Sequence, residues 1–196
     1  PIFESGYLMP DNGHCEDPYG MAKALVRLFL ERGGKFQKAE VLDIDFDPIG
    51  VTGVATTAGK FPADHAVVCA GIWSKDICAR LGWKVPLESH RGYHVTLENP
   101  GTSLNHMCFP VEDKFAITPM SMGVRVAGTV ELAGVDAPPN YARSQALLRA
   151  ATKLLPGIRT EKVTQWMGHR PCLPDSLPVI DSCPHNKGIT FAFGHG

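Results

Sequence analysis

Three prolines, Pro171, Pro174 and Pro178, restrict the segment TQWMGHRPCLPDSLPVI at residues 164–180 more than any other feature restricts the chain. Each proline fixes its own φ angle and lacks a backbone donor, which excludes the segment from a helix interior and from a central strand. Pro171 also favours extended geometry at Arg170. The sequence therefore predicts an arginine held on a stiff, irregular path, an arrangement that a merely solvated charge does not need.

The bulk properties of the chain narrow the classes of partner. Its 196 residues suffice for one large domain or two small ones, and its net charge of −1 gives no broad reason to expect nucleic acid or an anionic membrane. No apolar run approaches the roughly 20 residues of a membrane span, and no signal peptide is visible at the N-terminus. The six cysteines are scattered without a C-x-x-C pair, so we expect buried free thiols and a cytoplasmic protein.

The patterning predicts a mixed α/β (α+β) fold. A helix is expected from about Pro18 to Arg32, capped by Asp17, and a second that Asn140 caps and that runs to about Leu155. The apolar run HAVVCAG at residues 65–71 favours a parallel strand covered on both faces, followed by a short helix that Ser74 caps. Residues 90–97, 115–118 and 123–132 read as an antiparallel sheet, and residues 188–196 as the last strand.

Metal binding and nucleophilic catalysis are disfavoured by spacing. His90 and His94 lie on an expected strand, where four residues span about 13 Å, too far for two bonds of about 2 Å to one zinc ion. No G-x-S-x-G motif is present, and no G-x-G-x-x-G loop opens a helix. We therefore expect no metal, and the phosphate-binding cradle of any nucleotide lies outside this chain.

Two features remain, each with two interpretations. Gly71 in VVCAGIWS either only permits a strand-to-helix turn or serves a site. Arg170 in GHRPCLPD either forms a salt bridge or surface charge, or anchors a carboxylate through two parallel hydrogen bonds. The residues alone leave both choices open.

Taken in order, the segments VVCAGIWS, VPLESHRGYHVTL, FAITP, VRVAGTVELAG, GHRPCLPDSLPVI and FGHG resemble the flavin-dependent amino-acid oxidoreductases of the D-amino-acid oxidase superfamily. The D-amino-acid dehydrogenase and glycine-oxidase-like branch is the most similar. The resemblance implies FAD and a small-molecule substrate, which is an amino acid (a D-amino acid or a glycine-like one) or an amine. It also implies hydride transfer from the substrate Cα to the flavin, which gives an imine. It also implies a partial FAD-binding, Rossmann-like domain at 1–88, a mostly antiparallel substrate-binding domain at 89–170, and a return to the FAD-binding domain at 171–196.

The resemblance also implies roles for individual residues. Arg170 matches the arginine that binds the substrate carboxylate. Arg91 and His195, the other two residues expected to be catalytic, match positions near the flavin ring. The positions expected to contact the cofactor are Val41, Ala70, Gly71, Trp73, Gly92, Gly194 and Gly196. Ala116 stands where several relatives carry a substrate-facing tyrosine, which leaves the side-chain pocket undefined.

The chain is expected to be a fragment, because the N-terminal G-x-G-x-x-G strand and helix of the family are missing. The remainder of its own chain is then a partner, a peripheral membrane electron acceptor is possible, and the chain alone is expected to bind little FAD and to be inactive. Two alternatives stay open. The same fold could oxidise a secondary amine such as sarcosine, dimethylglycine or proline, or the chain could be a non-catalytic binding module.

Overall fold

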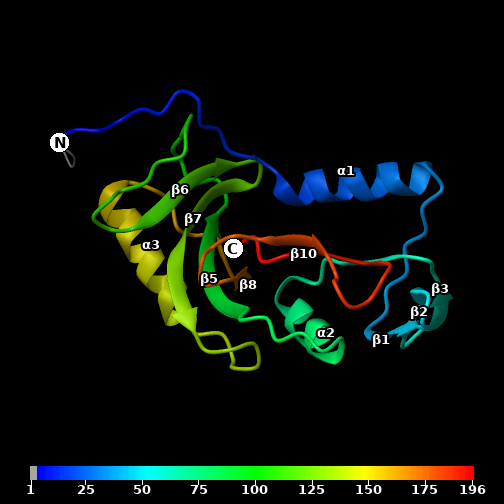
Figure 1. Ribbon diagram of the computed structural model, residues 1–196. Helices are drawn as coiled ribbons and strands as arrows, with labels where there is room; N and C mark the ends of the chain where they lie inside the picture. The colour runs from blue at the N-terminus through cyan, green and yellow to red at the C-terminus, as the bar shows by residue number, and fades with distance from the viewer. Residues whose placement is uncertain (1–3) are drawn as a thin grey trace. The chain divides into compact units, whose positions relative to one another are not determined.

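Helices and strands follow one another in the order expected of a mixed α/β fold, and the computed structural model describes residues 4–196 (Figure 1). The helices are α1 (Pro18–Glu31), the 3-10 turn η1 (Gly71–Trp73), α2 (Ser74–Arg80) and α3 (Ala142–Leu154). The strands are β1 (Val41–Phe46), β2 (Val51–Thr56), β3 (Gly59–Pro62), β4 (Ala66–Val68), β5 (Glu88–Leu97), β6 (Phe115–Met120), β7 (Gly123–Leu132), β8 (Val163–Cys172), β9 (Val179–Ser182) and β10 (Ile189–Phe193).

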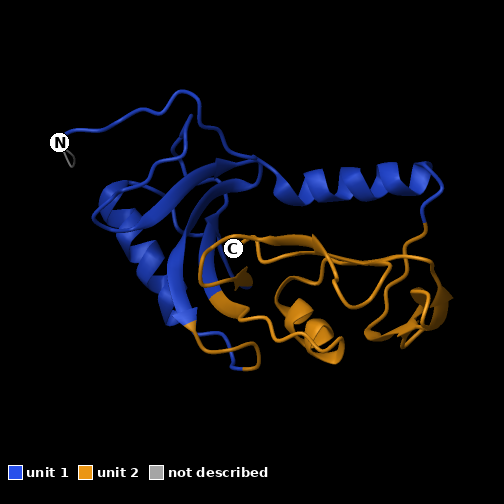
Figure 2. Ribbon diagram, viewed as in Figure 1, with its two compact units in different colours: residues 1–34, 91–131, 137–168 blue, residues 35–90, 132–136, 169–196 orange. Residues whose placement is uncertain are grey.

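The chain divides into two units, each built from segments distant in the sequence (Figure 2). Unit 1 comprises Pro1–Gly34, Arg91–Glu131 and Ala137–Gly168, and unit 2 comprises Lys35–His90, Leu132–Asp136 and His169–Gly196. The three-part division 1–88, 89–170 and 171–196 concerns functional domains rather than contacts, and it stays a prediction.

Unit 2 contains two small sheets. Strands β1, β2 and β3 form an antiparallel meander, and β10 pairs in parallel with β4 and antiparallel with β9. The parallel pairing predicted for HAVVCAG is confirmed, but its burial on both faces is not. Ala66 and Val68 are buried, whereas Val67 between them is 59% exposed, so the strand buries one face only.

Unit 1 contains most of a four-stranded sheet in the order β6-β7-β5-β8, with α3 packed on one face. The first residues of β5 and the last residues of β8 belong to unit 2. Tyr93, Val95, Phe115 and Val126 contribute to the unit 1 core together with Leu147 of α3. The antiparallel pairing of β6 with β7 confirms the predicted sheet.

The path of Arg170 differs from the prediction. Arg170 and Pro171 lie inside β8, a regular strand, rather than on an irregular path. The reason is that β8 is the last strand of its sheet, where a residue without a backbone donor can be accommodated. The extended geometry expected at Arg170 is confirmed, and the exclusion from a central strand holds.

The predicted helix caps have different outcomes. The Asn140 side-chain oxygen accepts a 3.3 Å hydrogen bond from the amide of Ala142, the first residue of α3. The Asp17 carboxylate accepts a hydrogen bond of 2.8 Å from the Gly20 amide, which confirms the cap of α1. Ser74 does not cap α2. The turn Gly71–Trp73 runs directly into α2, so the Ser74 amide already bonds to carbonyls of that turn and its side chain is fully buried inside the helical segment.

Thr129 reverses the alternation of side chains along β7. Val124 and Val126 are buried against the α3 side, and continued alternation would bury Val130 and turn Glu131 away from the core. Thr129 has a φ of 61°, a left-handed conformation that is unfavourable for a β-branched residue. After it, Val130 is 53% exposed and Glu131 forms an ion pair with the buried Arg91. The strained residue therefore re-aims Glu131 toward Arg91.

Replacing Thr129 with glycine tests this conformation. Glycine has no Cβ, so it avoids the clash that costs other residues about 1–2 kcal/mol at a positive φ. This gain exceeds the entropic cost of placing a glycine in a strand, which is about 0.5–1 kcal/mol. We expect Thr129→Gly to raise the free energy of unfolding in urea by about 0.5–1 kcal/mol. Thr118→Gly on β6, where φ is not positive, is the control and should lower it by a similar amount. A loss of stability in both variants would contradict the left-handed assignment.

Candidate functional site

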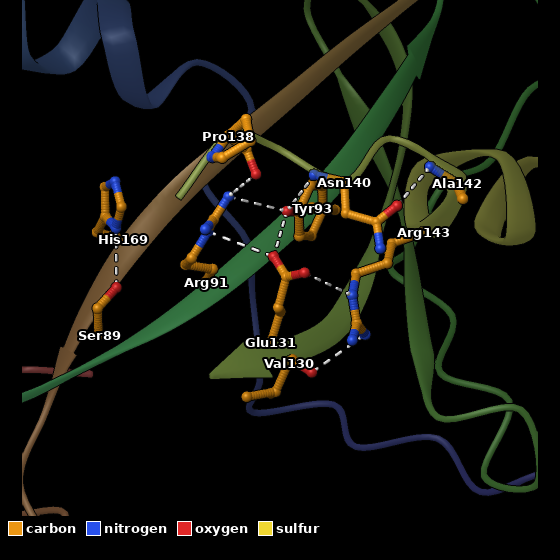
Figure 3. Close-up of polar contacts among 10 residues, drawn as sticks. All are labelled: Ser89, Arg91, Tyr93, Val130, Glu131, Pro138, Asn140, Ala142, Arg143 and His169. Carbon is orange, nitrogen blue, oxygen red and sulfur yellow. Dashed lines mark hydrogen bonds and ion pairs between the residues drawn. The ribbon is translucent and has the colours of Figure 1, made fainter. Parts of the chain in front are cut away.

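His169 joins three of the segments that the sequence singled out, all within unit 2. Its Nδ1 atom lies 2.8 Å from the hydroxyl of Ser89, the second residue of β5, which is 1% exposed (Figure 3). Its ring packs edge-on against Trp73 of the Gly71 turn, with 5.8 Å between ring centroids and an interplanar angle of 71°. Since His169 immediately precedes Arg170 on β8, these two contacts fix the backbone that carries the arginine.

The GHG segment at residues 194–196 forms a hydrogen bond to β8, the strand that carries His169 and Arg170. The Gly196 amide donates a 3.1 Å hydrogen bond to the carbonyl of Pro171, the residue after Arg170. Gly194 is buried with a φ of 83°, and a Cβ there would lie 2.8 Å from Leu173. Packing and backbone conformation thus account for the glycine at 194, while His195 and Gly196 are exposed.

Several positions assigned to the expected cofactor present open surface. Gly71 has a φ of 56°, and a Cβ there would meet no heavy atom within 4 Å. Trp73 is 56% exposed, and Val41 on β1 is also exposed. A backbone turn that is open on its outer side and flanked by a half-exposed indole fits the approach of a large planar group such as FAD.

The remaining predicted residues lie in other surroundings. Ala70 and Arg170 are partly buried, and Gly92 is buried inside β5. The structure therefore brings the Gly71 turn, the strand that carries Arg170 and the GHG segment together within unit 2. The cofactor and substrate roles of these residues stay predictions.

Arg91 is fully buried in unit 1 and takes part in a polar network (Figure 3). Its Nε lies 3.3 Å from a carboxylate oxygen of Glu131, and its Nη2 donates a 2.8 Å hydrogen bond to the Pro138 carbonyl. The Tyr93 hydroxyl donates to the same Glu131 oxygen and accepts a 2.9 Å hydrogen bond from the Asn140 amide. These contacts hold the segment before α3 against β5. They give Arg91 a positioning role, and its catalytic role stays a prediction.

Glu131 is the centre of that network. Its other carboxylate oxygen lies 3.5 Å from Arg143 of α3, and its side chain is 14% exposed. The hydrogen bond from Tyr93, followed by the charges of Arg91 and Arg143, lowers the pKa of Glu131 below its usual range although partial burial acts in the opposite direction. The carboxylate is therefore ionised throughout the neutral range.

The lowered pKa of Glu131 predicts how stability depends on pH. The folded state binds this proton less readily than the unfolded state, so the stabilisation is fully present above the ordinary pKa of 4.5 and is lost as pH falls through the folded value. We expect Glu131→Gln to be less stable than the natural chain at pH 7, with a difference that shrinks as the pH falls below 4.5. Urea titrations at several pH values measure it, with the exposed Glu161→Gln as control. A difference that does not change with pH would refute the ionised network.

Loss of the Ser89 hydroxyl should release the His169 ring. Ser89→Ala leaves the partly buried Nδ1 without its partner, which costs about 1–2 kcal/mol of folding stability. We expect that loss in urea denaturation and a change in the nitrogen chemical shifts of the His169 ring as its tautomers redistribute. Ser182→Ala, at an exposed position of the same unit, is the matched control. Unchanged His169 shifts in Ser89→Ala would show that the hydrogen bond does not fix the ring.

Metal sites, membrane-spanning helices and disulfides were also sought among the side chains and helices of residues 4–196. Within residues 4–196, no three His, Cys, Asp or Glu side chains converge on a possible metal position. The described helices include none with the length and apolar character needed to cross a membrane. All six cysteines are free, but only Cys78 and Cys183 are buried, so the expectation of buried thiols holds for two of them.

Sequence reasoning missed Ser89, His169 and Glu131. The position of His169 beside Arg170 was the one available signal, because a residue adjacent to an anchor can fix its backbone. No local pattern marks Ser89, which is 80 residues from His169.

Residues 1–196 match the family model described as "FAD dependent oxidoreductase". The chain is 35% identical to a D-amino-acid oxidase of Bradyrhizobium diazoefficiens over 200 residues, which cover 100% of this chain and 48% of that protein. It is 30% identical to a D-amino acid dehydrogenase of Paramagnetospirillum magneticum, covering 97% of this chain and 46% of that protein.

Among solved structures, the fold is similar to glycine oxidase from Geobacillus kaustophilus, with a TM-score of 0.77, 29% identity, and coverage of 89% of this chain and 48% of that one. The chain thus spans about half the length of the relatives it matches.

Proposed function

The chain belongs to the DAO family of FAD dependent oxidoreductases, and we propose that it forms the substrate-anchoring part of an enzyme that oxidises an amino acid. The observation that carries the proposal is the junction at His169, which connects the strand bearing Arg170 to the open Gly71 turn within one unit. The names of the relatives, D-amino-acid oxidase and D-amino acid dehydrogenase, support a primary amino acid as the substrate class.

Arg170 is the proposed anchor of the substrate carboxylate. A guanidinium presents its donors in a planar fork that matches the two oxygens of a carboxylate, and it stays charged at any physiological pH. The extended backbone of β8, fixed at His169 by Ser89 and Trp73 and tied at Pro171 by the Gly196 amide, limits the motion of the arginine. A pre-ordered anchor loses less entropy when the substrate binds, so more of the binding energy remains for orientation of Cα.

The proposed cofactor contacts are the backbone around Ala70 and Gly71, the Trp73 indole, the β1 backbone at Val41, and the exposed end at His195 and Gly196. When bound, FAD supplies the acceptor for the hydride that leaves the substrate Cα. The protein then has to bind the carboxylate, orient the amine and keep water from the reacting carbon. Arg170 performs the first of these tasks.

Removal of Arg170 tests the anchor in the full-length protein. Truncating one partner of a hydrogen-bonded charge pair costs about 2–5 kcal/mol, so we expect Arg170→Ala to lower kcat/KM by about 30-fold to a few thousand-fold. Arg170→Lys keeps the charge but loses the two-point contact, so its kcat/KM should lie between those of the natural protein and Arg170→Ala. Arg149→Ala, at an exposed position of α3, is the control. Steady-state kinetics that do not change in Arg170→Ala would reject the anchor.

A further inference from the structure

Asn12 and Gly13 lie next to each other in the irregular segment that precedes α1, and both are exposed. The Asn12 backbone amide donates a 3.2 Å hydrogen bond to the Met9 carbonyl. Its side-chain amide donates a 3.4 Å hydrogen bond to the Met9 sulfur. A thioether is a weak acceptor, so the Asn12 side chain is held only loosely and is open to water.

The fold does not account for a glycine at position 13. An ideal Cβ there would meet no heavy atom within 4 Å, and Gly13 is not among the glycines with a positive φ. An alanine would therefore fit at this position without a clash or a strained backbone. None of the backbone hydrogen bonds between loops and turns of residues 4–196 uses the Gly13 amide. The nitrogen that follows Asn12 is thus both unhindered and exposed.

The other four asparagines have different neighbours. The pairs are Asn99–Pro100, Asn105–His106, Asn140–Tyr141 and Asn186–Lys187. Proline has no backbone N–H, and each of the other three neighbours has a Cβ that crowds its backbone nitrogen. Two of these asparagines are also held by a hydrogen bond. The Oδ1 atom of Asn140 accepts from the Ala142 amide at 3.3 Å, and that of Asn186 accepts from the Cys183 thiol at 3.5 Å.

We propose that Asn12 is a site of spontaneous deamidation, with Gly13 as the residue that permits it. The backbone nitrogen of Gly13 gives up its proton to a solvent base and attacks Cγ of Asn12. The new N–C bond closes a cyclic imide, the Cγ–Nδ2 bond breaks, and the side-chain nitrogen takes up a proton and leaves as ammonia. Water then opens the ring at either carbonyl and gives aspartate or isoaspartate. The net reaction consumes one water, releases one ammonia and transfers no electrons.

The product carries a new negative charge in a segment that already contains Asp11, Glu16 and Asp17. The contacts that attach this segment to the fold are made after Asn12. The Glu16 carbonyl accepts a 3.0 Å hydrogen bond from the Ser121 amide, and Asp17 caps α1. Deamidation therefore yields a folded but more acidic form of the protein. The reaction uses neither flavin nor substrate, so it does not depend on the proposed function.

Peptide mapping by mass spectrometry tests the site in the full-length protein incubated at pH 8. We expect conversion at Asn12 to be at least about tenfold faster than at any other asparagine, because only Gly13 leaves the attacking nitrogen unhindered. An acidic form should appear on anion exchange at the same rate. Conversion should be slower at pH 6, because the Gly13 nitrogen attacks only after it has lost its proton. Urea should accelerate conversion at Asn140, which the fold holds, far more than at Asn12.

Two glycine variants separate the role of Gly13 from that of exposure. Gly13→Ala should slow conversion at Asn12 at least about tenfold, because the added Cβ crowds the attacking nitrogen. Gly6→Ala, at an equally open glycine of the same segment, is the matched control and should leave the rate unchanged. Neither substitution meets a neighbouring atom, so both variants should keep the circular dichroism spectrum of the natural protein. Equal rates at all five asparagines, or an unchanged rate in Gly13→Ala, would overturn the proposal.

Discussion

The contact between the Ser89 hydroxyl and the His169 ring is the interaction on which the rest of the site depends. It connects the start of β5 with the end of β8 through two residues that are 80 positions apart in the sequence. The edge-on packing of the same ring against Trp73 adds the Gly71 turn. One partly buried imidazole therefore brings together three segments of unit 2 and fixes the backbone next to Arg170. Arg170, the proposed anchor, is therefore positioned by its neighbour His169 and not by proline alone.

Strain at Thr129 has a comparable role in unit 1. The left-handed residue interrupts the alternation of β7, so that Glu131 reaches the face that carries Arg91 and Tyr93. The resulting network of one carboxylate and two arginines offsets the cost of the strained backbone, and it secures the segment before α3. The same reversal keeps the Glu131 carboxylate away from the face that carries Arg125.

Much of the fold could be predicted from local patterns. Apolar periodicity, the Asp17 cap and the parallel run HAVVCAG depend on neighbouring residues, and the structure bears them out. The predictions that were wrong concern features that depend on residues distant in the sequence. The edge position that accommodates Pro171 depends on the strand order, and the exposure of Val67 depends on what packs on its sheet. The Ser89–His169 contact joins distant segments, so no local pattern could reveal it. The Arg170 anchor and the cofactor contacts came from resemblance, and they stay predictions.

Arg170 on β8 is proposed to anchor the amino acid that this member of the FAD dependent oxidoreductase family oxidises. Anaerobic mixing of the full-length, flavin-loaded protein with a series of D-amino acids tests that role most directly. We predict that the flavin absorbance is bleached at rates that saturate with substrate, and that amines lacking the carboxylate bleach it far more slowly. Equal bleaching by carboxylate-free amines, or none by any amino acid, would contradict it.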